Sequence, residues 1–250
     1  MAQECWEFYF AQLGGRSASI FFDDCLSARL EGIDLPNALR LRVTMKQPGE
    51  DGLSSSHEFD ALNQLENTIV ERLARLGTVH LGRVTTGGQR YINFLTSMTD
   101  GEAAPILALI QAETGYEIRA RVEPDPQRTA YWDELYPSDD DRSLLNDLKC
   151  FENLAGAGDQ DTIGRQIDHL VCFKSSASRL QFQEIIERAG FKTDRLYEDI
   201  VHNPDVFCMA FSRVDKPRMG DFTKMNIALR RKVSELDGKH EGWTCSAVTD

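Results

Sequence analysis

The chain has 250 residues, of which 41% are hydrophobic and 27% charged, and its formal net charge is -12. This length predicts two domains of ~100 to 150 residues, and the composition is typical of a globular protein. The negative charge argues against binding of nucleic acid or of an anionic membrane. No apolar run reaches the ~20 residues that span a bilayer, and the first residues lack the pattern of a signal peptide, so we expect a cytoplasmic protein.

The first region opens with two short strands. Residues 6–10 and 17–23 are aromatic or β-branched runs on either side of Leu13-Gly14-Gly15-Arg16, which predicts a hairpin. Residues 38–46 then alternate between apolar and polar side chains. This pattern indicates a strand with one buried face and one solvated face.

Two capping-box patterns predict the helices of this region. Ser55-x-x-Glu58 precedes an apolar stripe that ends at Gly77, and Thr99-x-x-Glu102 precedes a shorter one that ends at Gly115.

Three further strands complete the first region, at residues 78–86, 89–96 and 116–123. The first two flank Gly87-Gly88, a turn suited to a hairpin. From residue 38 onward the order is strand, helix, strand, strand, helix, strand. This order predicts a ferredoxin-like unit with two helices on one face of an antiparallel sheet.

In that topology the first and fourth strands are neighbours, which brings four arginines together on the face away from the helices: Arg40, Arg42, Arg119 and Arg121. One interpretation is an anion-binding surface, and the other is a solvated face balanced by Glu117 and Glu123. Direct binding of RNA to this arginine face is a third alternative, but exposed aromatic side chains, which RNA recognition uses, are sparse there. We therefore expect no direct nucleic-acid contact.

The second region follows an acidic junction at residues 131–141. Residues 131–161 hold nine acidic and two basic side chains, a net charge of -7. Ser138-x-x-Asp141 starts a helix whose first-turn acids suit the helix dipole. We predict domains at residues 1–137 and 138–250, and we expect the junction with its helix to hold them in a fixed relation.

After that extra helix the first region's order recurs, with predicted strands at residues 167–173, 191–197, 206–214 and 243–248 and predicted helices at 179–189 and 221–236. The expected fold class is α+β, with two ferredoxin-like βαββαβ sandwich domains built on antiparallel sheets. The first has an extra N-terminal hairpin and the second an extra N-terminal helix. The strands at 167 and 206 are apolar on both faces, so the Ser138 helix, the first domain or a second copy in a homo-oligomer must cover the second face.

The cluster most suggestive of catalysis or metal binding comprises Asp159, Asp161, Asp168 and His169. Asp159, Asp168 and His169 offer carboxylate and imidazole groups, which suit either role in an uncharacterised enzyme or metal-binding protein. Adjacent residues on a strand point to opposite faces, however, so we favour a turn and a structural histidine. We expect no catalytic residue, metal or cofactor.

The six cysteines are scattered, without the spacing of a zinc site. They are predicted to be free, small, buried hydrophobic side chains, and the alternative is a thiol cluster of Cys172, Cys208 and Cys245.

Several short motifs carry a family resemblance. An acidic helix is followed by Ile167-Asp168-His169, Gly190-Phe191, Val206-Phe207-Cys208 and Gly242-Trp243, and residues 144–248 thereby resemble RraB, the bacterial regulator of ribonuclease E activity. Residues 1–137, with Trp6-Glu7-Phe8-Tyr9 at the start and residues 131–138 (YWDELYPS) at the close, resemble the bacterial domain of unknown function 695 family.

The resemblance to RraB implies a regulator that is not an enzyme. Such proteins bind the scaffold region of ribonuclease E and act as inhibitors of its RNA cleavage, so the expected partner is ribonuclease E or another component of RNA decay. Those regulators usually end in an acidic tail, whereas the last helix here is rich in Lys and Arg. The candidate partner-binding residues are Asp139, Asp140, Asp141, Asp159, Asp168, His169 and Trp243.

Overall fold

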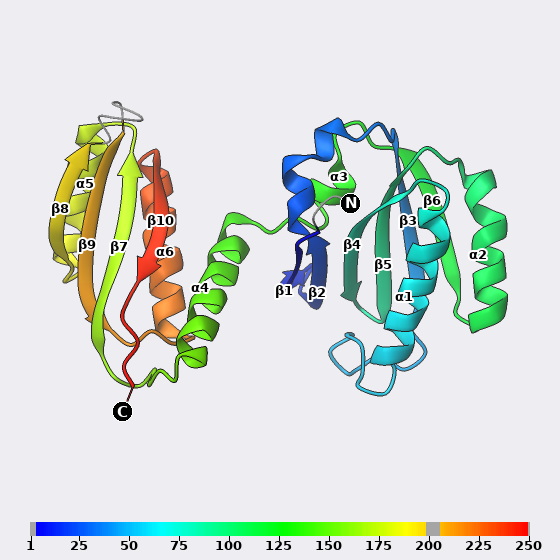
Figure 1. Cartoon of the computed structure of the whole chain (residues 1–250), viewed down its shortest axis with the longest axis horizontal. Helices are drawn as coiled ribbons and strands as arrows, with labels where there is room; N and C mark the ends of the chain where they lie inside the picture. The colour runs from blue at the N-terminus through cyan, green and yellow to red at the C-terminus, as the bar shows by residue number, and fades with distance from the viewer. Residues whose placement is uncertain (1–3, 199–205, 250) are drawn as a thin grey trace. The chain divides into compact units, whose positions relative to one another are not determined.

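The computed structural model describes residues 4–198 and 206–249 (Figure 1). The chain divides into two compact units, residues 1–137 (the first domain) and residues 138–250 (the second domain). In the described residues each domain has one antiparallel sheet, of six strands in the first and four in the second. The fold is therefore α+β with two α/β-sandwich domains, as predicted.

The strands of the first sheet lie in the order β1-β2-β4-β5-β3-β6. The elements of this domain are β1 (Trp6–Leu13), β2 (Arg16–Asp23), η1 (Asp24–Ala28), η2 (Leu30–Gly32), β3 (Asn37–Thr44), α1 (Phe59–Ala74), β4 (Val79–Thr86), β5 (Gln89–Thr96), α2 (Asp100–Thr114), β6 (Ile118–Pro124) and α3 (Thr129–Trp132). The run from β3 to β6 is the predicted βαββαβ unit, and the hairpin β1-β2 extends its sheet beyond β4. Both hairpins turn at two glycines with positive φ, a conformation that glycine adopts without strain.

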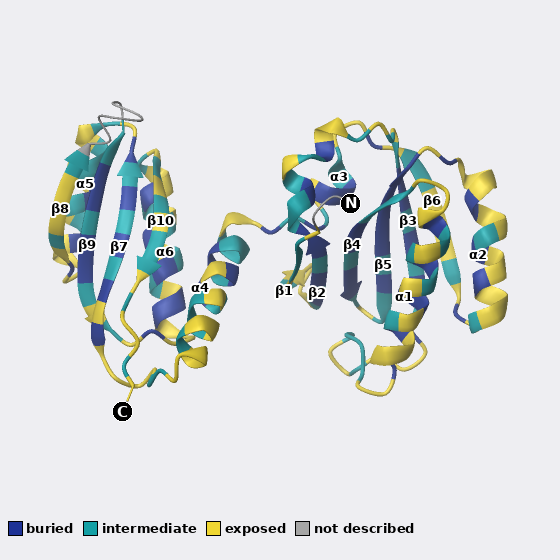
Figure 2. Ribbon diagram, in the orientation of Figure 1, coloured by how far each residue is buried: buried dark blue, intermediate teal, exposed yellow. Residues whose placement is uncertain are grey.

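Helices α1 and α2 cover one face of this sheet. Leu39, Leu41 and Val43 of β3 are fully buried in one core with Leu62 and Ile69 of α1. Figure 2 shows buried and exposed positions alternating along the helices that cover the sheet. Each fully buried side chain of this kind contributes ~1.5 to 3 kcal/mol.

The start of α1 differs from its predicted capping box. The carboxylate of Glu58 accepts hydrogen bonds from the backbone N–H groups of Lys46 (2.7 Å) and Gln47 (2.6 Å). The hydroxyl of Ser55 donates to the carbonyl of Gln47 (2.6 Å). The two side chains therefore fasten the loop after β3 and do not cap the helix, whereas the second predicted box is present at the start of α2.

The last residues of the first domain fold onto the other face of its sheet. Tyr131 and Leu135, in and after α3, are completely buried. The Tyr131 hydroxyl donates to the carbonyl of Asp23 (2.9 Å), and the Tyr9 hydroxyl donates to the carbonyl of Leu135 (3.0 Å). The stretch predicted as the start of a junction is therefore a layer of the first domain.

The strands of the second sheet lie in the order β10-β7-β9-β8. The elements of this domain are α4 (Asp139–Gly156), β7 (Arg165–Phe173), α5 (Ser176–Arg188), β8 (Lys192–Glu198), β9 (Phe207–Asp215), α6 (Asp221–Glu235) and β10 (Gly238–Thr244). From β7 onward the order is the predicted βαββαβ. The last strand begins before its predicted start at Trp243, because Asp237 (φ 54°) turns the chain directly from α6 into β10.

Helices α5 and α6 cover one face of the second sheet, where Phe173 and Phe211 pack with Phe182 and Val233. Helix α4 does not cover the opposite face, contrary to one of the alternatives above. It packs against α6, where the rings of Phe151 and Phe222 are 6.0 Å apart.

Disulfides correct the prediction that the cysteines are free. Cys172 and Cys208 lie directly opposite each other on β7 and β9 and form one bridge, because opposed side chains on neighbouring strands are within reach. A second bridge joins Cys5 to Cys25, while Cys150 and Cys245 are free thiols.

Candidate functional sites

The predicted arginine face forms on β3 and β6. The register of these strands places Arg40 opposite Arg121 and Arg42 opposite Arg119, so the four side chains share the face away from α1 and α2. Arg119 and Arg121 are the most exposed, at 68% and 73% of their side-chain surface. The strand pairing expected from the βαββαβ order is therefore confirmed.

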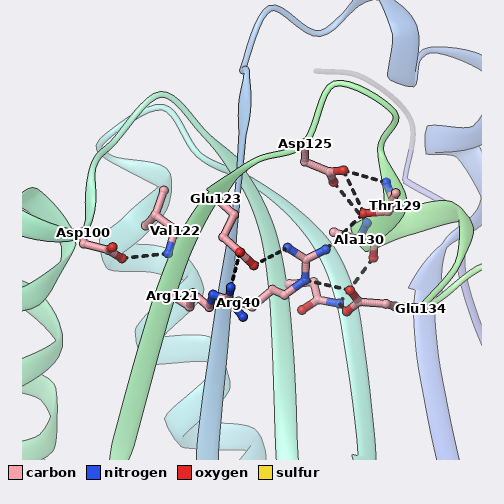
Figure 3. Close-up of polar contacts among 10 residues, drawn as sticks. Arg40, Asp100, Arg121, Val122, Glu123, Asp125, Thr129, Ala130 and Glu134 are labelled. Atoms are coloured by element: carbon pink, nitrogen blue, oxygen red, sulfur yellow. Dashed lines mark hydrogen bonds and ion pairs between the residues drawn. The ribbon is translucent and has the colours of Figure 1, made fainter.

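Carboxylates neutralise most of this positive charge (Figure 3). Arg40 donates to Glu134 (2.7 Å) and lies 3.7 Å from Glu123, which also pairs with Arg121 (2.5 Å). Arg119 pairs with Glu117 and, as the largest cause, lowers the pKa of that carboxyl.

The layer formed by α3 fixes this network. Asp125 accepts hydrogen bonds from the backbone N–H groups of Thr129 (2.8 Å) and Ala130 (3.1 Å). Glu134 also accepts from Asn93 of β5 (2.9 Å). The carboxylates that face Arg40 are thus held in place by the first domain itself, which favours a structural role for the arginine face.

A groove of about 760 Å³ lies between α1 and the strands β1, β2 and β4. Glu66 is buried on its wall and accepts from Arg83 (2.9 Å) and Arg90 (3.0 Å). Burial lowers the pKa of Arg90 to about 10 and is also the main cause of the lowered pKa of His80, whose ring nitrogen lies 3.8 Å from Glu66. The ionisable side chains here include both signs of charge, so the groove is not a dedicated anion site.

The second domain has a hollow of about 550 Å³ between α4, α6 and β10, called the α4 hollow below. Asp147 of α4 is buried there and accepts hydrogen bonds from Asn226 (2.6 Å) and Trp243 (2.7 Å). Because both donors are neutral, burial dominates and raises the pKa of Asp147 to about 6. These three side chains join α4 to α6 and to β10.

Two histidines pack beside the α4 hollow. His169 is buried and stacks on Phe211 at 5.0 Å between ring centroids, and its Nδ1 lies 3.4 Å from Nε2 of His240. Burial, as the largest cause, lowers the pKa of His169 to about 3 and that of His240 to about 4. Both rings are therefore neutral near pH 7, which agrees with the predicted structural role of His169.

The candidate acidic residues of the second domain fall in separate places. Asp140 forms ion pairs with Arg230 and Arg231. Asp139 also lies 3.5 Å from Arg230, although 86% of its side chain is exposed. Asp141 receives the hydroxyl hydrogen bond of Ser138 (2.5 Å) at the start of α4.

The alternative of one catalytic or metal site at Asp159, Asp168 and His169 is not supported by this geometry. Asp159 pairs with Arg165 and accepts the backbone N–H of Val248 (2.7 Å). Asp168 receives a bond from Gln166 on the outer face of β7, whereas His169 points into the core. Within residues 4–198 and 206–249, no group of three or more His, Cys, Asp or Glu side chains could hold a metal ion.

The chain is a two-domain α+β protein, and most of its candidate site residues form hydrogen bonds or ion pairs within their own domain. Residues 4–136 match the model of the family of unknown function (DUF695), and the chain belongs to that family. Residues 146–245 match the family described as regulator of ribonuclease activity B (RraB). The predicted order of an N-terminal DUF695 domain and a C-terminal RraB-like domain is confirmed.

Two solved structures have weak similarity to the chain. One is a putative glycine cleavage system transcriptional repressor, with 9% identity, a TM-score of 0.27 and coverage of 86% of this chain and 100% of that one. The other is an unknown protein from Galdieria sulphuraria, with 10% identity, a TM-score of 0.23 and the same coverage. Scores this low carry no argument about fold or function. No curated protein matches the chain significantly, and none of the described helices is long and apolar enough to cross a membrane.

Proposed function

We propose that the protein is a non-catalytic regulator that binds a protein component of RNA decay through its second domain. The observation that carries the proposal is the match of residues 146–245 to regulators of ribonuclease activity, because this range contains Asp147, Asn226 and Trp243 of the α4 hollow. Members of that family bind ribonuclease E, which is therefore the proposed partner. The proposed location of the protein is therefore the cytoplasm.

The rim of the α4 hollow is the proposed contact surface. Asp139 lies 3.5 Å from Arg230 but remains 86% exposed, whereas Asp140 is held more closely by Arg230 and Arg231. Asn146 lines the same hollow about two turns further along α4. Exposed carboxylates in the first turn of α4 attract a basic segment of a partner, and such attraction raises the association rate and falls with salt. Trp243 and Asp147, by contrast, shape the hollow from within.

The test is a binding measurement between the full chain and the purified scaffold region of ribonuclease E at low salt. Replacing Asp139 with Lys is expected to weaken binding at least about 10-fold, which corresponds to ~1.4 kcal/mol. The matched control is Asp221→Lys, because Asp221 is also a highly exposed acid in the first turn of a helix, α6. A failure of the unmodified chain to bind at low salt contradicts the proposal, and equal losses in the two variants contradict the proposed surface.

A further inference from the structure

Strand β1 leaves one edge of the first sheet open among the described residues, since it pairs with β2 and no strand lies beyond it. It runs over eight residues, from Trp6 to Leu13. Natural proteins usually protect an exposed edge with Lys, Pro or a bulge. This strand contains none of these, and its single charged residue is Glu7.

The register of the hairpin shows which backbone groups face outward. Leu13 and Arg16 close the two-residue turn, so Leu13, Ala11, Tyr9 and Glu7 form the hydrogen-bonded pairs with β2. The bond from the N–H of Asp24 to the carbonyl of Cys5 continues the same alternation. The intervening residues direct their N–H and C=O groups toward the open edge. These are Trp6, Phe8, Phe10 and Gln12.

Two of these outward residues expose large apolar side chains. Phe8 is 46% and Phe10 59% exposed, and their rings meet edge to face at 4.8 Å. They lie on the same face of the sheet as Phe21, which is opposite Phe8 in the register. The open edge therefore combines unpaired backbone groups with an aromatic surface, the two features that favour strand addition.

We propose that two copies of the chain associate by antiparallel pairing of β1 with β1, about a two-fold axis at Tyr9. In this register Phe8 lies opposite the partner's Phe10, and Trp6 lies opposite the partner's Gln12. All four outward residues of each copy then form hydrogen-bonded pairs, which follows from the alternation of an antiparallel ladder. An axis at Phe8 or at Phe10 leaves at least one of the four without an opposite residue in the strand.

The sequence of the strand favours a second copy over an unrelated partner. A two-fold interface uses the same patch twice, so the patch must complement itself. Phe8 and Phe10 meet this condition because each finds a phenyl ring opposite, and aromatic cross-strand pairs stabilise a sheet more than alanine pairs do. This surface belongs to the first domain and is independent of the regulator function proposed for the second.

The first test is the molar mass of the full chain in solution, measured by light scattering over a dilution series. The unmodified chain is expected at twice the monomer mass, and Phe8→Lys with Phe10→Lys at the monomer mass. Leu109→Lys is the control. Leu109 is 56% exposed on α2, and α2 packs beside β6, the strand at the opposite edge of the sheet from β1. A monomeric unmodified chain, or a lysine pair that stays dimeric, overturns the proposal.

The second test reports the register and does not depend on the lysine variant folding. With the axis at Tyr9, position 7 faces position 11 of the partner as a pair without hydrogen bonds, the geometry that suits a cross-strand disulfide. Glu7→Cys combined with Ala11→Cys is expected to give a covalent dimer on a non-reducing gel, while either single variant gives none. Crosslinking by a single variant, or none by the double variant, overturns the proposed pairing.

Discussion

The two domains share one strand order and differ in how the second face of the sheet is closed. In the first domain, Tyr131 and Leu135 follow the last strand and bury themselves on the face opposite α1 and α2. In the second domain, the extra helix α4 precedes the first strand and joins the helix layer beside α6, while Val214 on the outer face stays 68% exposed. In each domain the added segment lies where its apolar side chains find contacts, at Tyr131 and Leu135 in the first domain and at Phe151 in the second.

The domains also differ in how they satisfy a buried carboxylate. Glu66 in the first domain faces Arg83 and Arg90, so its charge is paired. Asp147 in the second domain receives only neutral donors, from Asn226 and Trp243. Burial of an unpaired charge is costly, and the two sites should therefore respond in opposite directions when the carboxylate is removed.

The largest expected effect is acid destabilisation of the second domain. The folded pKa values of His169 and His240, about 3 and about 4, lie below the ordinary value of 6.5. Below pH 6.5 the unfolded chain therefore binds more protons at these two histidines than the folded chain does. The free energy of unfolding that is present above pH 6.5 falls by on the order of 5 kcal/mol as the pH drops toward 4. Unfolding by urea at a series of pH values measures this loss. His240→Asn should reduce it, whereas His57→Asn, at an exposed position, should not.

The next effect tests the layer that closes the first domain. Tyr131→Ala should lower the free energy of unfolding by about 4 kcal/mol, because it empties a fully buried site and removes a hydrogen bond. Urea unfolding gives the value. Its neighbour Trp132 is 38% exposed, so Trp132→Ala should cost clearly less. Equal losses would mean that the segment does not pack as described.

The paired carboxylate gives a smaller loss. Glu66→Gln should destabilise the first domain by about 3 kcal/mol, since Arg90 stays buried without its counter-charge. Glu71→Gln is the control, as Glu71 is an exposed acid of the same helix. A loss no larger than that of the control would show that Glu66 is not a structural ion-pair partner.

The unpaired carboxylate gives the smallest effect and the opposite sign. The folded pKa of Asp147, about 6, lies above the ordinary value of 3.8, so its contribution favours the folded state below pH 3.8 and is lost as the pH rises through 6. Asp147→Asn should therefore stabilise the second domain by about 2 kcal/mol at pH 7 and by much less at pH 4. The difference between variant and unmodified chain, measured by urea unfolding at the two pH values, isolates this group from the histidines.

Local patterns were sufficient to predict the fold. The alternation of Leu39, Leu41 and Val43, the two glycine pairs and the box at Thr99 are each set by neighbouring residues, and all appear as expected. Ser55 and Glu58 have the spacing of a capping box. The Glu58 carboxylate instead accepts hydrogen bonds from two backbone N–H groups of the preceding loop.

The sites were missed because their partners are distant in sequence. Asp147 meets Trp243 across 96 positions, and Arg90 meets Glu66 across 24. The available signal was an acid within an apolar stripe, at Glu66 between Leu65 and Ile69 and at Asp147 between Leu145 and Leu148. The many acidic residues of the junction favoured the prediction of an exposed segment. The helical spacing of Tyr131 and Leu135 was the signal that these two side chains are buried.

Hydrogen exchange of the full chain tests most directly the claim that the first domain closes both faces of its sheet with its own residues. The N–H groups of Leu135 and Tyr136 both donate to the carbonyl of Tyr131, at 3.1 and 2.8 Å. These amides are predicted to exchange as slowly as those of β5, because the layer opens only with the domain. Exchange at the rate of the exposed loop around Glu50 would contradict the claim.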